Sequence, residues 1–289
     1  REIAQELQCN FNASGETVIH GDDLKLILEK VIEPKHKTGF DRNYWIWKEP
    51  EPQNEYILVA DVARGDGSDF SVAHIFDTQT MEQVAEYRGK IAPDMFAPQL
   101  YSMASEYNDA LLIIENNSLG IGVLTRMQDL DYKNLYYSIK STHEYVDEVS
   151  AQALGGVAGF TMSMKTRPLV IAKFEEFVRN KLITINSVRL ANEIKTFVWH
   201  NGRPQAMRSY NDDLVIAACI GCWVRDTALT ANKREADYKR ALLSSISVSS
   251  TTINTKIEGQ HGYKPNKSQP RRFTGSDGKE HDLNWIIKG

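Results

Sequence analysis

Cysteine is scarce in this sequence of 289 residues, which contains only Cys9, Cys219 and Cys222. An odd and sparse set of cysteines excludes the small disulfide-stabilised folds and is typical of a reducing compartment. The pair in "CIGC" lacks a second pair of metal ligands and lies within an apolar run. We therefore expect two buried structural thiols there rather than a zinc or redox site.

Several other features are missing. No run of about 18 apolar residues is present, so no membrane-spanning helix is predicted. The opening "REIAQELQCNF" has neither Met nor an apolar signal core, and we expect it to begin inside a longer polypeptide. No G-x-x-x-x-G-K-[ST] motif occurs, so we expect no ATP hydrolysis by this stretch. The net charge of −4 and the pI near 6.0 exclude a uniformly basic nucleic-acid coat.

The sequence does contain two short, nearly continuous apolar runs, 56–62 and 110–116, which are typical of strands buried on both faces. Turns between 56–62, 70–77 and 82–90 are short enough for antiparallel hairpins. Helices are expected at 93–108, 118–130, 169–180, 188–200 and 211–229, and further short strands at 134–139 and 182–185. This order predicts an α/β fold, with a mixed central sheet that is flanked by helices.

Composition divides the chain into three parts. Residues 1–52 are predicted to be a lead-in segment, in which 1–13 has helical composition, and 53–228 a compact α/β domain. Residues 229–289 are polar and rich in Gly, Ser, Thr and Pro, which predicts a tail. From residue 231 onward the chain has 11 Lys or Arg and 6 Asp or Glu, so the tail is basic and the remainder acidic.

Carboxylates stand at the ends of the two most apolar strands. Asp61 closes the first, Glu115 closes the second, and the pair Asp212-Asp213 opens a long apolar helix. If the two strands are parallel neighbours, their carboxyl ends meet at one edge of the sheet. Grouped carboxylates repel one another unless a cation lies among them, and hard ions such as Mg²⁺ or Mn²⁺ prefer oxygen ligands. Each residue alone has a simpler role in a turn or cap, so it is the combination that indicates a metal site.

The acidic pair is expected to divide its roles. Two adjacent helical residues point about 100° apart, so both do not face one metal ion equally. Asp212 suits the N-cap, where its side chain would accept a backbone N–H. Asp213 falls on the stripe that continues through Ile216, Ala217 and Ile220 and should face the sheet. We therefore expect Asp213 to hold metal and Asp212 to cap the helix or act in the outer shell.

Other segments are candidates for binding phosphate. Lys165 and Arg167 follow a Gly-rich stretch and are either DNA-backbone contacts or residues of a solvated loop. The amides and predicted helix start of "NNSLGIG" also suit a phosphate. His200 is expected at a helix end, and a DNA-facing position stays open for it.

Three segments, "LVADVARGDGSDFSVAHI", "LLIIENNSLG" and "YNDDLVIAAC", together resemble a known family. They are similar to the acidic motifs of the C-terminal nuclease domain of the large terminase subunit of tailed bacteriophages, and more narrowly of T4-like phages. The resemblance covers roughly residues 3–228. It implies a ribonuclease H-like fold of the resolvase/integrase type and a metal triad of Asp61, Glu115 and one of Asp212 or Asp213. Asp69 matches an additional acidic position near the first metal.

The resemblance also implies an activity and its setting. The activity is a Mg²⁺- or Mn²⁺-dependent endonuclease, with two ions, that cuts concatemeric viral DNA during head packaging. The implied partners are double-stranded DNA, the portal protein, the small terminase subunit and an ATPase domain of the same polypeptide. The implied location is the host cytoplasm at the prohead, with no membrane contact. Two alternatives stay open: a non-enzymatic docking module for the packaging machinery, and a Holliday-junction-type resolvase of the same fold.

Overall fold

A computed structural model describes residues 17–67, 69–139, 145–146 and 148–229, together with the short strands at 272–274 and 280–282. The chain forms two compact units, Arg1–Asn232 and Lys233–Gly289. In the second unit, β12 (Arg272–Thr274) pairs antiparallel with β13 (Glu280–Asp282). The helical composition predicted at 1–13 and the rest of the predicted tail lie outside the described residues.

The first unit is built on a six-stranded sheet with the order β1-β2-β5-β4-β3-β6. Its strands are β1 (His36–Thr38), β2 (Tyr44–Ile46), β3 (Tyr56–Asp61), β4 (Ser71–Asp77), β5 (Gln83–Gly89) and β6 (Leu111–Ile114). Strands β3, β4 and β5 form an antiparallel meander, and β6 runs parallel to β3. The predicted mixed sheet is thus confirmed.

Strands β1 and β2 lie within the stretch predicted as a lead-in, 1–52, and extend the sheet beyond β5. Trp47 follows β2 and is almost fully buried, with its indole N–H donating to the Ile32 carbonyl. These residues are therefore part of the folded unit. The predicted division at residue 52, as the border of a missing ATPase domain, stays a prediction.

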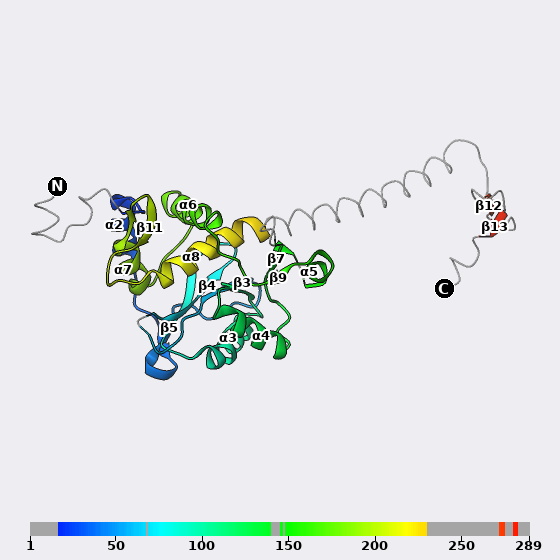
Figure 1. The fold of residues 1–289 in the computed structure, drawn as a ribbon, viewed down its shortest axis with the longest axis horizontal. Helices are drawn as coiled ribbons and strands as arrows, with labels where there is room; N and C mark the ends of the chain where they lie inside the picture. The colour runs from blue at the N-terminus through cyan, green and yellow to red at the C-terminus, as the bar shows by residue number, and fades with distance from the viewer. Residues whose placement is uncertain are drawn as a thin grey trace, which may run out of the picture. The chain divides into compact units, whose positions relative to one another are not determined.

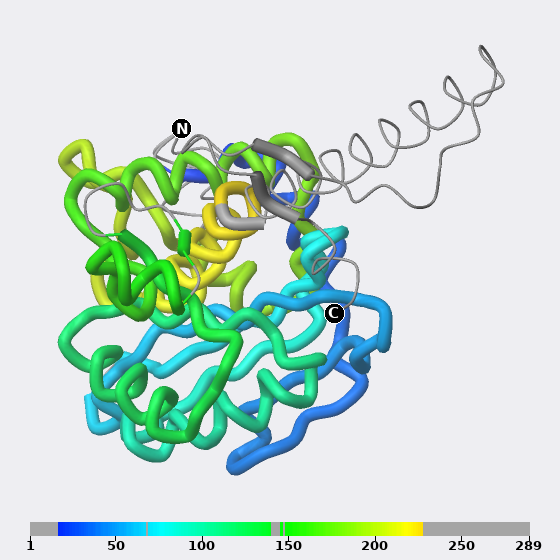
Figure 2. Tube along the Cα trace, turned by 90° about the vertical axis from the view of Figure 1, so that its right-hand side faces the viewer, coloured from blue at the N-terminus to red at the C-terminus, as the bar shows by residue number. Residues whose placement is uncertain are grey.

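Helices cover both faces of the sheet (Figure 1, Figure 2). On one face lie α3 (Pro93–Glu106) and α4 (Gly120–Asp129); on the other lie α2 (Gly21–Lys30), α6 (Thr166–Arg179), α7 (Val188–Thr196) and α8 (Asp213–Val224). Alternate residues of β3 enter the two cores: Ile57 and Val59 join the α8 side, whereas Leu58 and Ala60 join the α3 side. Burial on both faces explains why β3 is apolar without alternation.

Helix α8 packs directly on β3 and β4 and between α6 and α7. Leu214 to Cys222 are all buried, so this helix is apolar on every side. Its approach to the sheet is close at Gly221, where a Cβ would lie 3.3 Å from both Phe76 and Val59. Among the described residues no helix is long and apolar enough to cross a bilayer, and α8 is a core helix.

A smaller sheet lies after α4. It contains β7 (Tyr137–Ser138), β8 (Tyr145–Val146) and β9 (Val157–Ala158), with α5 (Glu148–Leu154) between the last two. The strand predicted at 134–139 is therefore shorter, although Leu135 also bridges to Leu112 in parallel fashion. The prediction of a strand at 182–185 is wrong, because Thr184 forms only an isolated bridge with Glu82.

The helix predicted at 188–200 is also wrong in its last turn. Helix α7 ends at Thr196, and β10 (Phe197–His200) follows at once and pairs with β11 (Arg203–Ala206). Asn201 and Gly202 both have positive φ, as a two-residue hairpin turn requires. His200 therefore sits in a hairpin rather than at a helix end. The remaining elements are a short 3₁₀ turn (Phe40–Arg42) and a π turn (Arg225–Leu229) after α8.

Candidate metal centre

Parallel pairing brings the first two carboxylates together. Ala60 of β3 lies opposite Ile114 of β6, and the Glu115 N–H donates to the Ala60 carbonyl at 3.1 Å. The carboxyl ends of both strands therefore meet at one edge of the sheet. The side chains of Asp61 and Glu115 share a hydrogen bond there. Two carboxyls that share a hydrogen bond hold a proton between them when no cation is present.

Glycine shapes the turn that follows Glu115. A Cβ at Gly120 would lie 1.9 Å from the Glu115 carbonyl oxygen, so only glycine allows α4 to start this close. The side-chain oxygen of Asn117 accepts the backbone N–H groups of Leu119 and Gly120, at 3.1 and 2.8 Å. These amides are satisfied within the protein. The prediction that this helix start holds a phosphate is therefore not supported by its geometry.

The third carboxylate arrives on the first residue of α8. One Asp213 oxygen accepts the backbone N–H of Phe70 at 3.1 Å and the Asn211 side-chain amide at 3.2 Å. Phe70 directly precedes β4, whose Val72 pairs with Asp61. These bonds draw the start of α8 to the same edge of the sheet. The sequence pattern alone did not identify Phe70 or Asn211 as partners of Asp213.

Burial raises the pKa of all three carboxyls, and nearby carboxylates add to each shift. Burial raises the pKa of Asp61 well above its usual range, and the neighbouring Glu115 and Asp213 carboxylates raise it further. Burial likewise raises the pKa of Glu115, although Arg167 opposes the shift. The pKa of Asp213 is raised by burial and then by the nearby Asp69 and Asp212. Without a cation, this edge of the sheet therefore retains protons on groups that are normally ionised.

An open cleft of about 270 Å³ lies over two of these carboxyls. Its lining includes Asp61, Asp69, Asp213, Arg64 and Asn117. Asp69 thus lies on the same cleft as Asp61 and Asp213, and its place near a first metal ion stays a prediction. Arg64 is exposed and pairs with Asp66 at 3.1 Å, so its charge is partly compensated.

Asp212 stands at the N-cap position of α8, as predicted, but its side chain makes no capping hydrogen bond, and the alternative outer-shell role stays a prediction. Its side chain accepts no backbone N–H at the helix start. Instead it accepts a hydrogen bond from the Arg167 guanidinium at 3.0 Å. Arg167 and Lys165 stand at the start of α6; Lys165 is exposed, whereas Arg167 is half-buried beside the acidic cluster. Their predicted role in DNA binding stays a prediction.

The donor set suits a hard divalent cation. The side chains that meet at this edge offer carboxylate and amide oxygens, which Mg²⁺ and Mn²⁺ prefer. Within the part of the chain that the structure describes, no three Asp, Glu, His or Cys side chains already surround a single metal position. The residues therefore fit the ion by their chemistry, and a bound ion would have to draw the carboxylates closer.

The two cysteines of α8 take no part in this site. Cys219 and Cys222 are free thiols with no exposed surface, and burial raises the pKa of both far above the usual value. Thiols in this state are unreactive. The prediction of structural cysteines is confirmed.

Comparison with known proteins identifies the fold. No protein-family model matches the sequence. The large terminase nuclease of the thermophilic phage G20c with bound magnesium superposes with a TM-score of 0.53 at 13% identity, covering 72% of this chain and 96% of that one. The cobalt-bound form of that nuclease gives the same TM-score and coverage at 14% identity. The chain has a terminase nuclease fold. The ribonuclease H-like class that we predicted is thereby confirmed, whereas the narrower likeness to T4-like phages stays a prediction.

Proposed function

We propose that this chain is a divalent-metal-dependent endonuclease domain that cuts double-stranded DNA. One observation carries the proposal: Asp61, Glu115 and Asp213 converge from β3, β6 and α8 on one edge of a terminase nuclease fold. The G20c nuclease was crystallised with magnesium and with cobalt, which supports a similar preference here. Mg²⁺ or Mn²⁺ is the proposed ion, and two ions are proposed per site.

Each residue would have a defined part in the reaction. Asp61 and Asp213 would hold one ion, Glu115 would help to hold the second, and Asp69 would stand near the first. When bound, such ions activate a water molecule and stabilise the leaving oxygen of a phosphodiester. The Phe70 N–H and the Asn211 amide orient the Asp213 carboxylate. Arg167 pairs with Asp212 and opposes the rise in the pKa of Glu115.

The biological setting follows from the resemblance. We propose cleavage of concatemeric viral DNA in the host cytoplasm at the prohead, beside the portal protein, the small terminase subunit and an ATPase domain. These partners are proposals that rest on the family rather than on contacts in this structure. Cleavage of branched DNA in preference to linear duplex would favour the resolvase alternative instead.

We expect the purified protein to nick and linearise plasmid DNA with Mg²⁺ or Mn²⁺ and to be inactive in EDTA. Asp61→Asn and Glu115→Gln should each abolish cleavage. Asp77→Asn is the matched control, because Asp77 is a buried carboxylate that holds a turn at the opposite end of β4. Gel assays on supercoiled plasmid provide the measurement. Cleavage that persists after complete chelation, or in Asp61→Asn, would contradict the proposed mechanism.

A further inference from the structure

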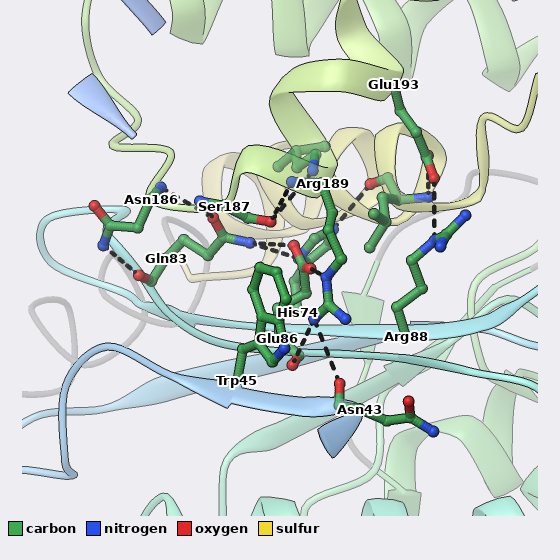
Figure 3. Close-up of polar contacts among 12 residues, drawn as sticks. Asn43, Trp45, His74, Gln83, Glu86, Arg88, Asn186, Ser187, Arg189 and Glu193 are labelled. Atoms are coloured by element: carbon green, nitrogen blue, oxygen red, sulfur yellow. Dashed lines mark hydrogen bonds and ion pairs between the residues drawn. The ribbon is translucent and has the colours of Figure 1, made fainter. Parts of the chain in front are cut away.

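The first turn of α8 is held by side chains from two other elements (Figure 3). The Leu214 N–H donates to the Glu193 carboxyl of α7 at 2.9 Å. The Leu214 carbonyl accepts from Nε2 of His74, on β4, at 2.9 Å. All of these groups are buried. The backbone directly after Asp213 is therefore fixed on both its donor and its acceptor side, from a helix above and from the sheet below.

The hydrogen bonds around Gln83 determine which nitrogen of His74 carries the hydrogen. The side-chain oxygen of Gln83 accepts the backbone N–H groups of residues 186 and 187, at 3.0 and 2.9 Å, which fixes the amide orientation. Its nitrogen then donates to Nδ1 of His74 at 3.0 Å and to Glu86 at 2.9 Å. His74 Nδ1 accepts, so Nε2 carries the hydrogen donated to Leu214. Burial lowers the pKa of His74, which favours this neutral form.

Helix α7 ties the same network to α8. Glu86 has no exposed surface, and its charge is compensated by Arg189, whose Nε donates to it at 2.6 Å. The Arg189 guanidinium also stacks 3.6 Å over the Trp45 ring. Glu193 follows Arg189 by one helical turn and therefore lies on the same face of α7. Since a buried carboxylate is costly to leave unpaired, Glu86 and Arg189 hold α7 firmly against β5.

We propose that His74 and Glu193 are positioning residues for the Asp213 carboxylate. The inference rests on the proposed function and adds to it two buried residues that do not line the cleft. The reasoning is geometric: metal ligands must be held to within about 0.5 Å, and supporting groups provide that precision. The Asp212 side chain makes no capping bond at the start of α8. Glu193 and His74 hold the backbone of Leu214, the residue after Asp213, instead.

Paired substitutions test the proposal. His74→Leu and Glu193→Leu remove the bonds to Leu214, whereas His74→Gln keeps a donor and Glu193→Gln keeps an acceptor at nearly the same place. Mn²⁺ binding to the metal-free protein is measured by calorimetry, and the Mg²⁺ concentration for half-maximal cleavage is measured in parallel. We expect each Leu variant to weaken Mn²⁺ binding by about 10-fold or more, as loss of supporting groups around a metal typically does. The Gln variants should restore most of the affinity.

A control separates positioning from general stability. Asp77→Ala removes a buried carboxylate that holds the turn at the far end of β4, and it should lower the unfolding temperature without changing Mn²⁺ affinity. If a Leu variant does not fold, Glu193→Ala or His74→Asn replaces it with the same expectation. Folded variants that bind Mn²⁺ like the wild type, or Gln variants as weak as their Leu counterparts, would overturn the positioning role alone. A wild-type protein that neither binds Mn²⁺ nor cuts DNA would overturn the proposed function as well.

Discussion

Asp212 and Asp213, at the start of α8, have different surroundings and should contribute differently to DNA cleavage. Asp213 lies in the cleft with Asp61, and Asp212 pairs with Arg167 beside it. We expect Asp213→Asn to lower the cleavage rate by about 100-fold or more, because it weakens an ion worth several kcal/mol to the transition state. Asp212→Asn should cost less than about 10-fold. Initial rates at saturating Mg²⁺ provide the measurement, and the reverse ranking would contradict this assignment.

The stability of the Asp212 variants follows from its actual contact. An N-cap lost to alanine would cost about 1 kcal/mol, but the Asp212 side chain makes no capping bond. It makes one partly exposed ion pair with Arg167, which is worth less than about 1 kcal/mol. The sequence predicts a capping side chain at Asp212 because such a prediction uses only the residues adjacent to the helix start. Glu193, from another helix, takes the Leu214 N–H instead, and no local pattern reveals that.

Sequence reasoning at this scale succeeded where a general rule links position to chemistry. Asp61 and Glu115 were identified because parallel strands bring their carboxyl ends to one edge, and the structure does bring them together. The supporting residues His74 and Glu86 were missed. Both are polar residues inside strands, His74 in β4 and Glu86 in β5, and both have no exposed surface. Which partners neutralise them depends on tertiary contacts.

Among the elements, strands and helices with strong apolar patterns were predicted well and the short connections were not. The helix expected at 188–200 continues the apolar period of α7, but the chain turns into β10 after Thr196. Asn201-Gly202 is a strong signal for a two-residue hairpin turn. The prediction followed the helical spacing of the apolar residues instead. Strands β1 and β2 have three residues each, too few for a pattern to stand out.

Helix α8 must pack closely on the sheet if it is to deliver Asp213 to the cleft. We expect Gly221→Leu to lower the free energy of unfolding by about 1–3 kcal/mol or more, because the new side chain would meet Phe76 and Val59. Gly122→Ala in α4 is the control, since nothing lies within 4 Å of a Cβ there. It should raise stability by about 0.5–1 kcal/mol through helix propensity. Urea unfolding measures the free energy of unfolding of both variants. Equal changes in that free energy would contradict the close packing of α8.

For the whole molecule, the fold class was predictable and the extent of the folded unit was not. The order of strands and helices already indicated a mixed sheet flanked by helices, as found. The segment 17–52 looked like a connection because its apolar residues are dispersed, yet Trp47 and the short strands β1 and β2 complete the sheet. Burial of such dispersed residues is decided by the neighbours that cover them, which a single sequence does not show.

The acidic site should make the stability of the whole unit depend on pH and on metal. Burial raises the pKa of Asp61, Glu115 and Asp213, and raises that of Glu193 to about 8. Between the usual carboxyl pKa and these raised values, the folded protein binds more protons than the unfolded chain. The four carboxyls outnumber His74, whose lowered pKa acts in the opposite direction below about pH 6.5. The free energy of unfolding of the metal-free protein should therefore fall as the pH rises from about 4.5 to 8.

Mn²⁺ should oppose this fall, because it replaces the protons and binds only the folded state. At 100 times its dissociation constant it adds about 2.7 kcal/mol, and the gain should be larger at pH 8 than at pH 5, where protons compete. Asp61→Asn should flatten the metal-free pH profile and remove most of the Mn²⁺ stabilisation, since it deletes one repelling charge and one ligand together. The unfolding temperature of each protein is measured at pH 5 and at pH 8, each with EDTA and with Mn²⁺. A metal-free protein that is more stable at pH 8, or an Asp61→Asn variant that keeps the full Mn²⁺ effect, would show that these carboxyls are not the metal site.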